Sequence, residues 1–240
     1  MKILITGAGT GLGRLTAIEL ARRGHDVLAG LHSSQGNESF QKHDGITTIE
    51  LDITEAQDRV HAAEFAPDVL VNNAGVSELG PLALMPMERA RHVFEVNVFG
   101  TLAMTQACLP AMIERGSGRL LFVSSIAGVS AGAIAGPYAM SKHAMQAMGA
   151  SLRQELAPQG IDVVLANPGA FATGFNDRMF DRLGEWLAGD DEKTYRPFIQ
   201  SLANAVTNDQ LDPKDAADQL ADLCEAKTTK LVNPIPPGLF

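Results

Sequence analysis

The stretch Ile3-Leu4-Ile5-Thr6-Gly7-Ala8-Gly9-Thr10-Gly11-Leu12-Gly13 decides the fold class of this chain. It begins as a short apolar run, typical of a buried strand, and then alternates glycine with other residues before an amphipathic segment. Glycine adopts positive φ and lets the backbone approach a ligand closely. A helix beginning near Leu12 would direct free N–H groups at a phosphate. The stretch therefore predicts a strand, a phosphate-binding turn and a helix, and the residues expected to contact a dinucleotide are Gly7, Thr10, Gly11, Leu12 and Gly13.

Outward from this turn, short apolar runs alternate with longer amphipathic segments. The runs are apolar throughout, as in parallel strands that are covered on both faces. The expected strands are residues 3–6, 27–31, 46–51, 69–72, 120–124, 163–166 and 231–232, and the expected helices are residues 12–24, 54–64, 86–115, 138–157 and 212–226. This order predicts an α/β fold with a doubly wound, mainly parallel, Rossmann-like sheet and helices on both faces. We expect residues 1–240 to form a single dinucleotide-binding and catalytic domain.

Residues 172–210 interrupt this alternation with aromatic side chains placed among charges and glycines. Such a segment is either a mobile lid over a substrate or a surface insertion whose aromatic residues pack on the core. The sequence leaves both interpretations open.

The composition is that of an ordinary acidic globular protein. The net charge of -9 disfavours nucleic acid as a partner, because an acidic surface repels a phosphate backbone. The two cysteines, Cys108 and Cys224, have neither metal-ligand nor redox spacing, so we expect free thiols in a reducing compartment. No histidine pair has the spacing of a metal site, and no metal is expected.

Two uncharged stretches, residues 96–113 and 120–141, resemble membrane spans only in their lack of charge. Both contain glycine, proline and polar side chains in numbers that a span seldom carries, so both are expected to be buried elements of a soluble fold. Residues 1–5 lead directly into the first strand and do not have the pattern of a signal peptide. We therefore expect a cytoplasmic protein without membrane attachment.

The end of the second predicted strand, Leu31-His32-Ser33-Ser34, bears on the choice of dinucleotide. An acidic residue at this position would bind both ribose hydroxyls of NAD, and none is present. A 2′-phosphate would meet no fixed negative charge there, while His32, the serines and Arg14 offer hydrogen-bond donors. This pattern favours NADP. Because no arginine follows the strand, NAD stays open, and so does a loop role for His32 without cofactor contact.

Tyr138 and Lys142 are four residues apart on a predicted helix and therefore share one of its faces. The phenol pKa is about 10, and lowering it by about three units takes roughly 4 kcal/mol, which a nearby ammonium supplies at an effective dielectric of about 20. The spacing alone also fits a helix-surface contact. Ser124 and Ser125 end a buried strand, at the edge where open α/β sheets bind ligands. A serine hydroxyl there is suited to holding a substrate oxygen.

In combination, these features resemble the compact, single-domain branch of the short-chain dehydrogenase/reductase family. The resemblance runs over residues 2–173, and its motifs follow one another in the family's order. The glycine turn looks like the family's nucleotide loop, and Asn72-Asn73-Ala74-Gly75 looks like its N-N-A-G motif. Ser125, Tyr138 and Lys142 look like its catalytic serine, tyrosine and lysine. Further matches are Asp52, Ile53, Asn97, Pro168, Gly169 and Thr173.

The resemblance implies which residues hold the cofactor. Asp52 would bind the adenine amino group, with Ile53 packing beside the ring. Asn73, Ala74 and Gly75 would border the cofactor, and Pro168, Gly169 and Thr173 would lie on its nicotinamide side. Tyr138 and Lys142 would also contact the cofactor.

The resemblance also implies a catalytic role for four side chains. Ser125 would hold the substrate oxygen, and Tyr138 would exchange a proton with it. Lys142 would lower the tyrosine pKa and hold the nicotinamide ribose. Asn97 would position a water that links Lys142 to solvent.

The sequence therefore predicts an NAD(P)-dependent oxidoreductase that transfers a hydride between a nicotinamide cofactor and a carbonyl or alcohol carbon, with Tyr138 as general acid or base. The alternative is a catalytically idle NADP-binding sensor. A hydrolase is disfavoured because Ser125 has no histidine and aspartate partners in the expected order. Residues 76–82, 126–136 and 172–210 are expected to line the substrate site, and their apolar character favours an apolar or moderately polar small molecule. The resemblance further implies a homodimer or homotetramer.

Overall fold

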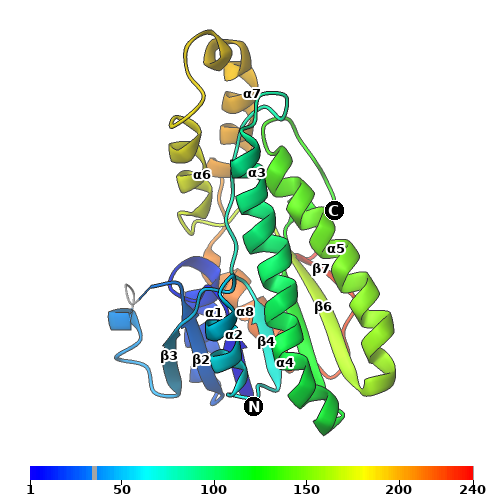
Figure 1. Cartoon of the computed structure of the whole chain (residues 1–240). Helices are drawn as coiled ribbons and strands as arrows, with labels where there is room; N and C mark the ends of the chain where they lie inside the picture. The colour runs from blue at the N-terminus through cyan, green and yellow to red at the C-terminus, as the bar shows by residue number, and fades with distance from the viewer. Residues whose placement is uncertain (34–36, 240) are drawn as a thin grey trace.

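The computed structural model describes residues 1–33 and 37–239. Within them, seven strands form one sheet in the order β3-β2-β1-β4-β5-β6-β7, and every adjacent pair is parallel (Figure 1). The strands are β1 (Lys2–Ile5), β2 (Asp26–Leu31), β3 (Ile46–Glu50), β4 (Val69–Asn72), β5 (Gly118–Val123), β6 (Ile161–Pro168) and β7 (Val232–Ile235). The strand order reverses between β1 and β4. The prediction of a doubly wound, parallel, Rossmann-like sheet is confirmed.

Helices cover both faces of this sheet (Figure 1). One face carries α1 (Gly11–Arg22) and α8 (Pro213–Glu225), and the other carries α2 (Ala56–Ala63), α4 (Thr101–Arg115) and α5 (Gly136–Leu156). A shorter helix, α3 (Met87–Phe94), leads into α4 through a π-helical turn, Glu95–Gly100. This arrangement confirms the expected layers.

Alternation along each strand builds a separate core on each face. Ile3 and Ile5 of β1 pack in the cluster that contains α1 and α8, whereas Leu4 packs in the cluster of α2, α4 and α5. All three side chains are fully buried. Because both faces of the strands are covered, both sets of alternate residues must be apolar, which is why these segments show no alternation with polar residues.

The predicted elements are present with bounds shifted by a few residues, and one of them has an internal irregularity. Residues 86–115, expected as one helix, contain the π-helical turn around Asn97. The Asn97 side chain there exchanges hydrogen bonds with the backbone of Val76, at 2.8 Å and 2.9 Å. A single wide turn leaves the apolar pattern of a helix nearly unchanged, so periodicity does not reveal it.

Residues 172–210 contain two helices, α6 (Phe175–Leu183) and α7 (Gly189–Thr207), which project beyond the carboxyl ends of the strands (Figure 1). We call residues 175–207 the arm. Met179 and Leu183 of α6 are buried in a third apolar cluster, together with Leu79 and Ile134. In contrast, α7 contains no buried residue. The arm thus combines a helix that is packed on the rim of the fold with a helix that is largely solvated.

The helical run Met87–Arg115 is long and apolar enough to cross a membrane by length and composition alone. In this fold its side chains Met104, Cys108 and Met112 are fully or almost fully buried against the sheet. The run therefore serves as a core helix, in agreement with the prediction that residues 96–113 belong to a soluble fold.

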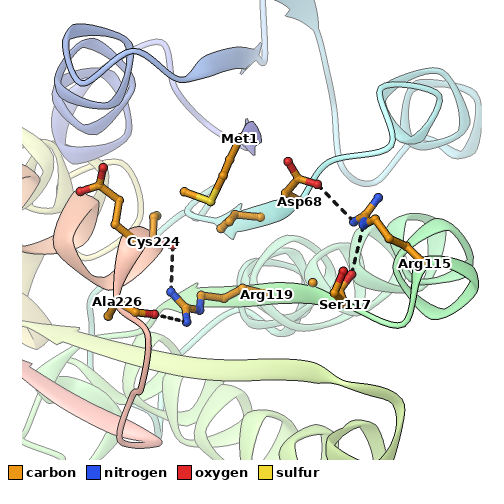
Figure 2. Close-up of a pocket in the computed structure, with 10 residues that line it drawn as sticks. Met1, Asp68, Arg115, Ser117, Arg119, Cys224 and Ala226 are labelled. Atoms are coloured by element: carbon orange, nitrogen blue, oxygen red, sulfur yellow. Dashed lines mark hydrogen bonds and ion pairs between the residues drawn. The ribbon is translucent and has the colours of Figure 1, made fainter.

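At the amino-terminal edge of the sheet, Arg119 ties β5 to the end of α8. Its guanidinium donates hydrogen bonds to the carbonyl oxygens of Leu223, Cys224 and Ala226, and it pairs with Asp162 at 3.0 Å. Figure 2 shows the bonds from Arg119 to Cys224 and Ala226, beside a cavity of about 300 Å3. One partly buried side chain thus supplies the donors for the last carbonyls of a helix.

Replacing Arg119 with leucine is expected to lower the free energy of unfolding by about 3 kcal/mol, because these carbonyls and the Asp162 carboxylate lose their donor. Urea unfolding followed by circular dichroism measures the change. Arg115→Leu is the matched control, because the Arg115 side chain is 33% exposed whereas that of Arg119 is 13% exposed. The control is expected to lose less than about 1 kcal/mol. Equal losses in the two variants would contradict the prediction.

Candidate active site

The glycine turn between β1 and α1 leaves no room for side chains. Gly7 and Gly11 have φ of +63° and +56°. A Cβ on Gly7 would lie 2.7 Å from the Cα of Ala74, and one on Gly13 would collide with the Asn73 side chain. Thr10, the residue before α1, makes no side-chain cap hydrogen bond, so it competes with no ligand for the first N–H groups of the helix. The turn fits a phosphate-binding role.

The N-N-A-G segment after β4 is bonded directly to this turn. Thr6 Oγ1 accepts hydrogen bonds from the backbone N–H groups of Asn73 and Ala74, at 3.1 Å and 3.0 Å. The Asn73 amide donates in return to the carbonyl oxygens of Thr6 and Gly7, both at 3.0 Å. Because β1 and β4 are the strands at which the sheet order reverses, these contacts lie where doubly wound folds bind ligands.

On the expected adenine side, Asp52 is held in place by its neighbours. Its carboxylate accepts hydrogen bonds from the backbone and hydroxyl of Thr54, at 2.9 Å and 2.7 Å, and lies 3.3 Å from His32. Partial burial raises the pKa of this carboxyl group, but the bonds from Thr54 and the nearby His32 outweigh it and lower the pKa. Ser34 lies outside the described residues. Ile53 is only 4% exposed and packs in the core cluster, so little of its side chain is available to an adenine ring.

A buried polar atom next to the glycine turn also bears on whether a ligand fits there. Arg14, which follows Gly13 in α1, has a buried Nε without a hydrogen-bond partner in the part of the chain that the structure describes. Buried donors normally have partners. Together with the narrow cradle at Gly7 and Gly13, this atom indicates that the residues present fit a bound dinucleotide.

The predicted catalytic side chains meet at the carboxyl edge of β5. Ser125 directly follows Ser124 at the end of the strand, and its Oγ accepts a hydrogen bond from the N–H of Ala127 at 3.1 Å. Tyr138 is half-buried near the start of α5, and its hydroxyl lies close enough to Ser125 for the serine to lower its pKa. Lys142 is 4% exposed, and its ammonium lies 5.7 Å from the centre of the Tyr138 ring. The three groups predicted from the sequence are therefore brought together.

Ser124, the other serine at this strand end, is occupied by contacts within the fold. It is 4% exposed, and its Oγ accepts a hydrogen bond from Gln146 at 3.0 Å. Gln146 also donates to the side chain of Asn167, at 2.8 Å. Of the two serines, Ser124 is therefore the one engaged by Gln146, and Ser125 is more exposed.

The electrostatics of the tyrosine and lysine differ from the predicted effect. Burial raises the pKa of Tyr138 to about 12, although the hydrogen bond with Ser125 lowers it in part. Burial also lowers the pKa of Lys142 to about 7, and its ammonium donates to the carbonyl of Val123 at 2.8 Å instead of to the phenol. The chain's own groups therefore favour a neutral phenol, whereas the sequence predicts a phenol with a lowered pKa. Desolvation of both groups is the physical reason.

Asn97 lies in the π-helical turn and clamps the loop after β4. Besides its bonds to Val76, its amide donates to Ser141 Oγ at 3.0 Å, and Ser141 donates to the Tyr138 carbonyl at 2.8 Å. A Cβ on Gly75 would lie 3.2 Å from Asn97 Oδ1 and 3.9 Å from the Lys142 ammonium. Asn97 and Lys142 thus converge on Gly75. The sequence analysis missed Ser141, and no spacing or composition signal marks it.

The segment after β6 returns to the glycine turn. Pro168 ends β6, and the N–H of Gly169 donates to the Ile235 carbonyl at 2.9 Å. Thr173 lies beside Gly11, because a Cβ on Gly11 would be 3.4 Å from the Thr173 Cβ. The chain then enters α6, where the Phe175 ring packs against Tyr138 with their centres 5.9 Å apart. Predicted cofactor and catalytic residues are thus connected by one short segment.

One pentapeptide, Gly128-Val129-Ser130-Ala131-Gly132, matches the letters of the hydrolase motif G-x-S-x-G. That motif requires a sharp strand-to-helix turn. Here the pentapeptide follows a short 3₁₀ turn and leads into a loop, and Ser130 is exposed. In the described residues, no group of three or more His, Cys, Asp or Glu side chains is arranged to hold a metal ion. Neither observation supports a hydrolytic or metal site.

The fold and this site together define a dinucleotide-binding oxidoreductase of the doubly wound class, and comparison with known proteins identifies the family. The family model described as short chain dehydrogenase matches residues 1–184. The uncharacterized oxidoreductase YusZ of Bacillus subtilis is 32% identical, over 98% of this chain and 89% of that protein. The 3-ketodihydrosphingosine reductase of Bacteroides thetaiotaomicron is 34% identical, over 83% of this chain and 74% of that protein. The chain belongs to the short-chain dehydrogenase/reductase family, whose members are NAD(P)-dependent oxidoreductases.

Solved structures show the same fold. A short-chain dehydrogenase from Streptomyces avermitilis has a TM-score of 0.84 at 28% identity, over 97% of this chain and 86% of that one. A short chain dehydrogenase from Burkholderia cenocepacia, crystallised in complex with NADP, has a TM-score of 0.75 at 26% identity over the same shares. Both comparisons cover nearly the whole of this chain, and they show that its fold is that of known short-chain dehydrogenases.

Proposed function

We propose that this protein is an NADPH-dependent reductase of apolar carbonyl compounds, which also oxidises the corresponding alcohols, with Tyr138 as the proton-transfer group. The observation that supports this best is that Ser125, Tyr138 and Lys142 lie together at the carboxyl edge of β5, with the Lys142 ammonium also close to Gly75. A phenol, a hydroxyl and an ammonium in this position are suited to acid–base chemistry on a carbonyl oxygen.

The mechanism follows from the states of these side chains. When bound, a reduced dinucleotide supplies the hydride. Tyr138, with a pKa of about 12, is protonated at neutral pH and therefore suited to donating its proton to the oxygen of a carbonyl that is being reduced. Ser125 donates a hydrogen bond to the same oxygen and holds it near the phenol. Lys142, with a pKa of about 7, gains its proton more readily beside an anion, and its ammonium then stabilises the phenolate that remains.

NADP is the dinucleotide that the site favours. The residues that end β2 carry no carboxylate that would repel a 2′-phosphate. Arg14 has a buried hydrogen-bond donor without a partner in the described residues. The relative from Burkholderia cenocepacia was crystallised with NADP. His32, whose side chain is 83% exposed next to Asp52, would contact the adenosine ribose and its phosphate.

A carboxylate at the end of β2 is expected to reverse this preference. His32→Asp should weaken NADPH binding by about tenfold or more and strengthen NADH binding, because the introduced charge repels a 2′-phosphate and accepts hydrogen bonds from a free ribose. Fluorescence titration with both dinucleotides measures the change. His61→Asp, which makes the same charge change on the exposed side of α2, is the control. Equal losses of NADPH affinity in both variants would show that only net charge matters.

The proposed substrate class rests on the surroundings of Tyr138. The third apolar cluster includes side chains of α6, the helix whose first residue contacts Tyr138. Its buried members are Leu79, Ile134, Met179, Leu183 and Leu187. Phe175 packs directly on the tyrosine ring. The relative from Bacteroides thetaiotaomicron is named for the reduction of a long-chain ketone. Apolar surroundings of this kind bind an aliphatic or aromatic ketone or aldehyde better than a sugar or a polyacid.

Other properties of the protein follow from the same proposal. We infer a single domain over residues 1–240, a cytoplasmic location and a homodimer or homotetramer built on the helices α4 and α5. The alternative, an idle NADP sensor, is disfavoured because a sensor has no need for the acid–base chemistry that Tyr138 offers beside Ser125 and Lys142.

The test is the oxidation of NADPH, and then of NADH, by the purified protein with a panel of carbonyl compounds that ranges from small polar to long apolar ketones. We expect turnover with NADPH and the apolar members, followed by the absorbance of the reduced nicotinamide. Dinucleotide binding without turnover across the whole panel would instead favour the sensor.

A further inference from the structure

A buried carboxylate connects the arm to the loop that follows β4. Glu78 is 4% exposed, although it is an acidic residue in a loop. One of its oxygens lies 3.1 Å from Arg89 of α3, and the other lies 3.4 Å from Arg182 of α6. Acidic residues are almost never buried to this extent unless they are paired. Each carboxylate oxygen of Glu78 therefore pairs with an arginine on a different helix.

The same loop is held firmly by its neighbours. Gly80 has φ of +144°, and a Cβ there would collide with the ring of Trp186, which follows α6. The N–H of Gly80 donates to the Ile134 carbonyl at 2.7 Å. Ile134 itself has φ of +72°, a conformation that a β-branched residue adopts only where the surrounding structure imposes it. Glu78 is thus attached to a rigid support.

The other end of α6 touches the reaction centre. Phe175, its first residue, packs on the Tyr138 ring, and Thr173 just before it lies beside Gly11 of the glycine turn. The helix therefore runs from the tyrosine at its start to Arg182 at its end. A shift of Arg182 relative to Glu78 would move Phe175 relative to Tyr138, because both are carried by one short helix.

On the proposed function, which this inference assumes, we propose that Glu78 is a positioning residue for the substrate. Its carboxylate fixes the end of α6, and through this helix it sets how closely Phe175 and the third apolar cluster approach a carbonyl compound at Tyr138. The residue does not touch the reacting atoms. It acts on the binding of the substrate and leaves the dinucleotide turn, which is bonded to Thr6 and Asn73, unchanged.

The ion pairs predict that a change of Glu78 affects α6 more than α3. Arg89 also pairs with Glu185 at 2.9 Å, so α3 keeps a partner when the Glu78 charge is removed. Arg182 pairs with Glu78 and its side chain is 43% exposed, so its guanidinium can turn to solvent when the Glu78 charge is removed. Glu78→Gln should therefore loosen the Arg182 end of α6, while the pair of Arg89 with Glu185 and the buried Met179 and Leu183 keep the helix folded on the rim.

The experiment compares Glu78→Gln with Glu185→Gln. The second variant removes the other carboxylate that pairs with Arg89, and this carboxylate is 59% exposed. For Glu78→Gln we expect the KM for an apolar ketone to rise by about tenfold while kcat and the dinucleotide Kd change by less than about twofold. For Glu185→Gln we expect all three values to change by less than about twofold. Adding Arg182→Met to Glu78→Gln should cause no further rise in KM, because the two residues act through one contact.

Hydrogen exchange supplies a readout that does not depend on activity. In Glu78→Gln, amides of residues 175–187 should exchange faster than in the unchanged protein, whereas those of α5 and α1 should keep their rates. If exchange in residues 175–187 and the KM are both unchanged, the proposal is overturned. If the unchanged protein reduces no carbonyl compound, the proposed function fails, and faster exchange confined to residues 175–187 still shows that Glu78 holds α6.

Discussion

Replacing Tyr138 with phenylalanine is expected to lower kcat for carbonyl reduction by about 1000-fold while the protein still folds and binds NADPH. The hydroxyl is the only group removed. The phenyl ring keeps its contact with Phe175, and the glycine turn is untouched. The loss is expected because, in the proposed mechanism, Tyr138 gives up its proton during hydride transfer, whereas Ser125 contributes only a hydrogen bond. Steady-state kinetics with NADPH and the best ketone of the panel measure it.

The sequence offers a matched control, because Tyr195 is the second of its two tyrosines. It lies on α7, in the arm, where its ring packs near Phe198. Tyr195→Phe removes the same hydroxyl away from the site and should leave kcat within about twofold of the unchanged protein. A Tyr138→Phe variant that retains more than about a tenth of kcat would show that another group transfers the proton.

Replacing Lys142 with methionine is expected to lower kcat by about 100-fold and, at the same time, to make the protein more stable at neutral and acidic pH. Burial lowers the pKa of this lysine from 10.5 to about 7. The unfolded chain therefore binds the proton more tightly than the folded protein does, and the burial of Lys142 costs about 4 kcal/mol at pH 7. Loss of its hydrogen bond to the Val123 carbonyl offsets part of the gain, so we expect a net rise of about 2 kcal/mol in the free energy of unfolding.

The direction of the pH dependence follows from the same shift. Below the folded pKa of about 7 both states hold the proton, and the cost of burial is present in full. Between pH 7 and 10.5 only the unfolded chain holds it, so the stability of the unchanged protein rises with pH in this range. The stability advantage of Lys142→Met should therefore shrink as the pH is raised from neutral towards 10.

Urea unfolding of both proteins at several pH values tests this prediction. Lys193→Met, which changes a lysine that is 66% exposed on α7, is the control and should show little difference at any pH. If Lys142→Met is less stable than the unchanged protein at pH 6, the lysine is a net stabilising residue and its burial has been overrated. If stability rises but kcat is unchanged, Lys142 has no part in the proton transfer.

Much of the site could be predicted from the sequence, because several of its signals are local. The glycines of the turn lie within one strand–helix connection, and Tyr138 and Lys142 lie one turn apart on one helix. Ser125 lies at the end of a strand, and the apolar residues of this strand predict that it is buried. The fold brings the serine, tyrosine and lysine together at one edge of the sheet, as the family resemblance implies. The role of each side chain stays a prediction.

Other features could not be predicted, because they depend on contacts between distant segments. The π-helical turn is tied to Asn97, whose partner Val76 is 21 residues away in the sequence. Ile53 packs in the core, since the face to which a loop residue turns depends on the helix above it, and its contact with an adenine ring stays a prediction. The sequence leaves residues 172–210 open between a lid and a packed insertion; the structure shows that α6 is packed and α7 is mostly exposed, and the role of a lid stays a prediction.

The sequence by itself determined the order of strands and helices, the phosphate-binding turn and the spacing of tyrosine and lysine, because periodicity and neighbouring residues are local properties of a chain. The tertiary structure alone decided the protonation of Tyr138 and Lys142 and the pairing of Glu78 with Arg182, which is 104 residues away. Burial and ion pairing depend on which segments fold against one another, and a pattern of neighbours does not contain that information.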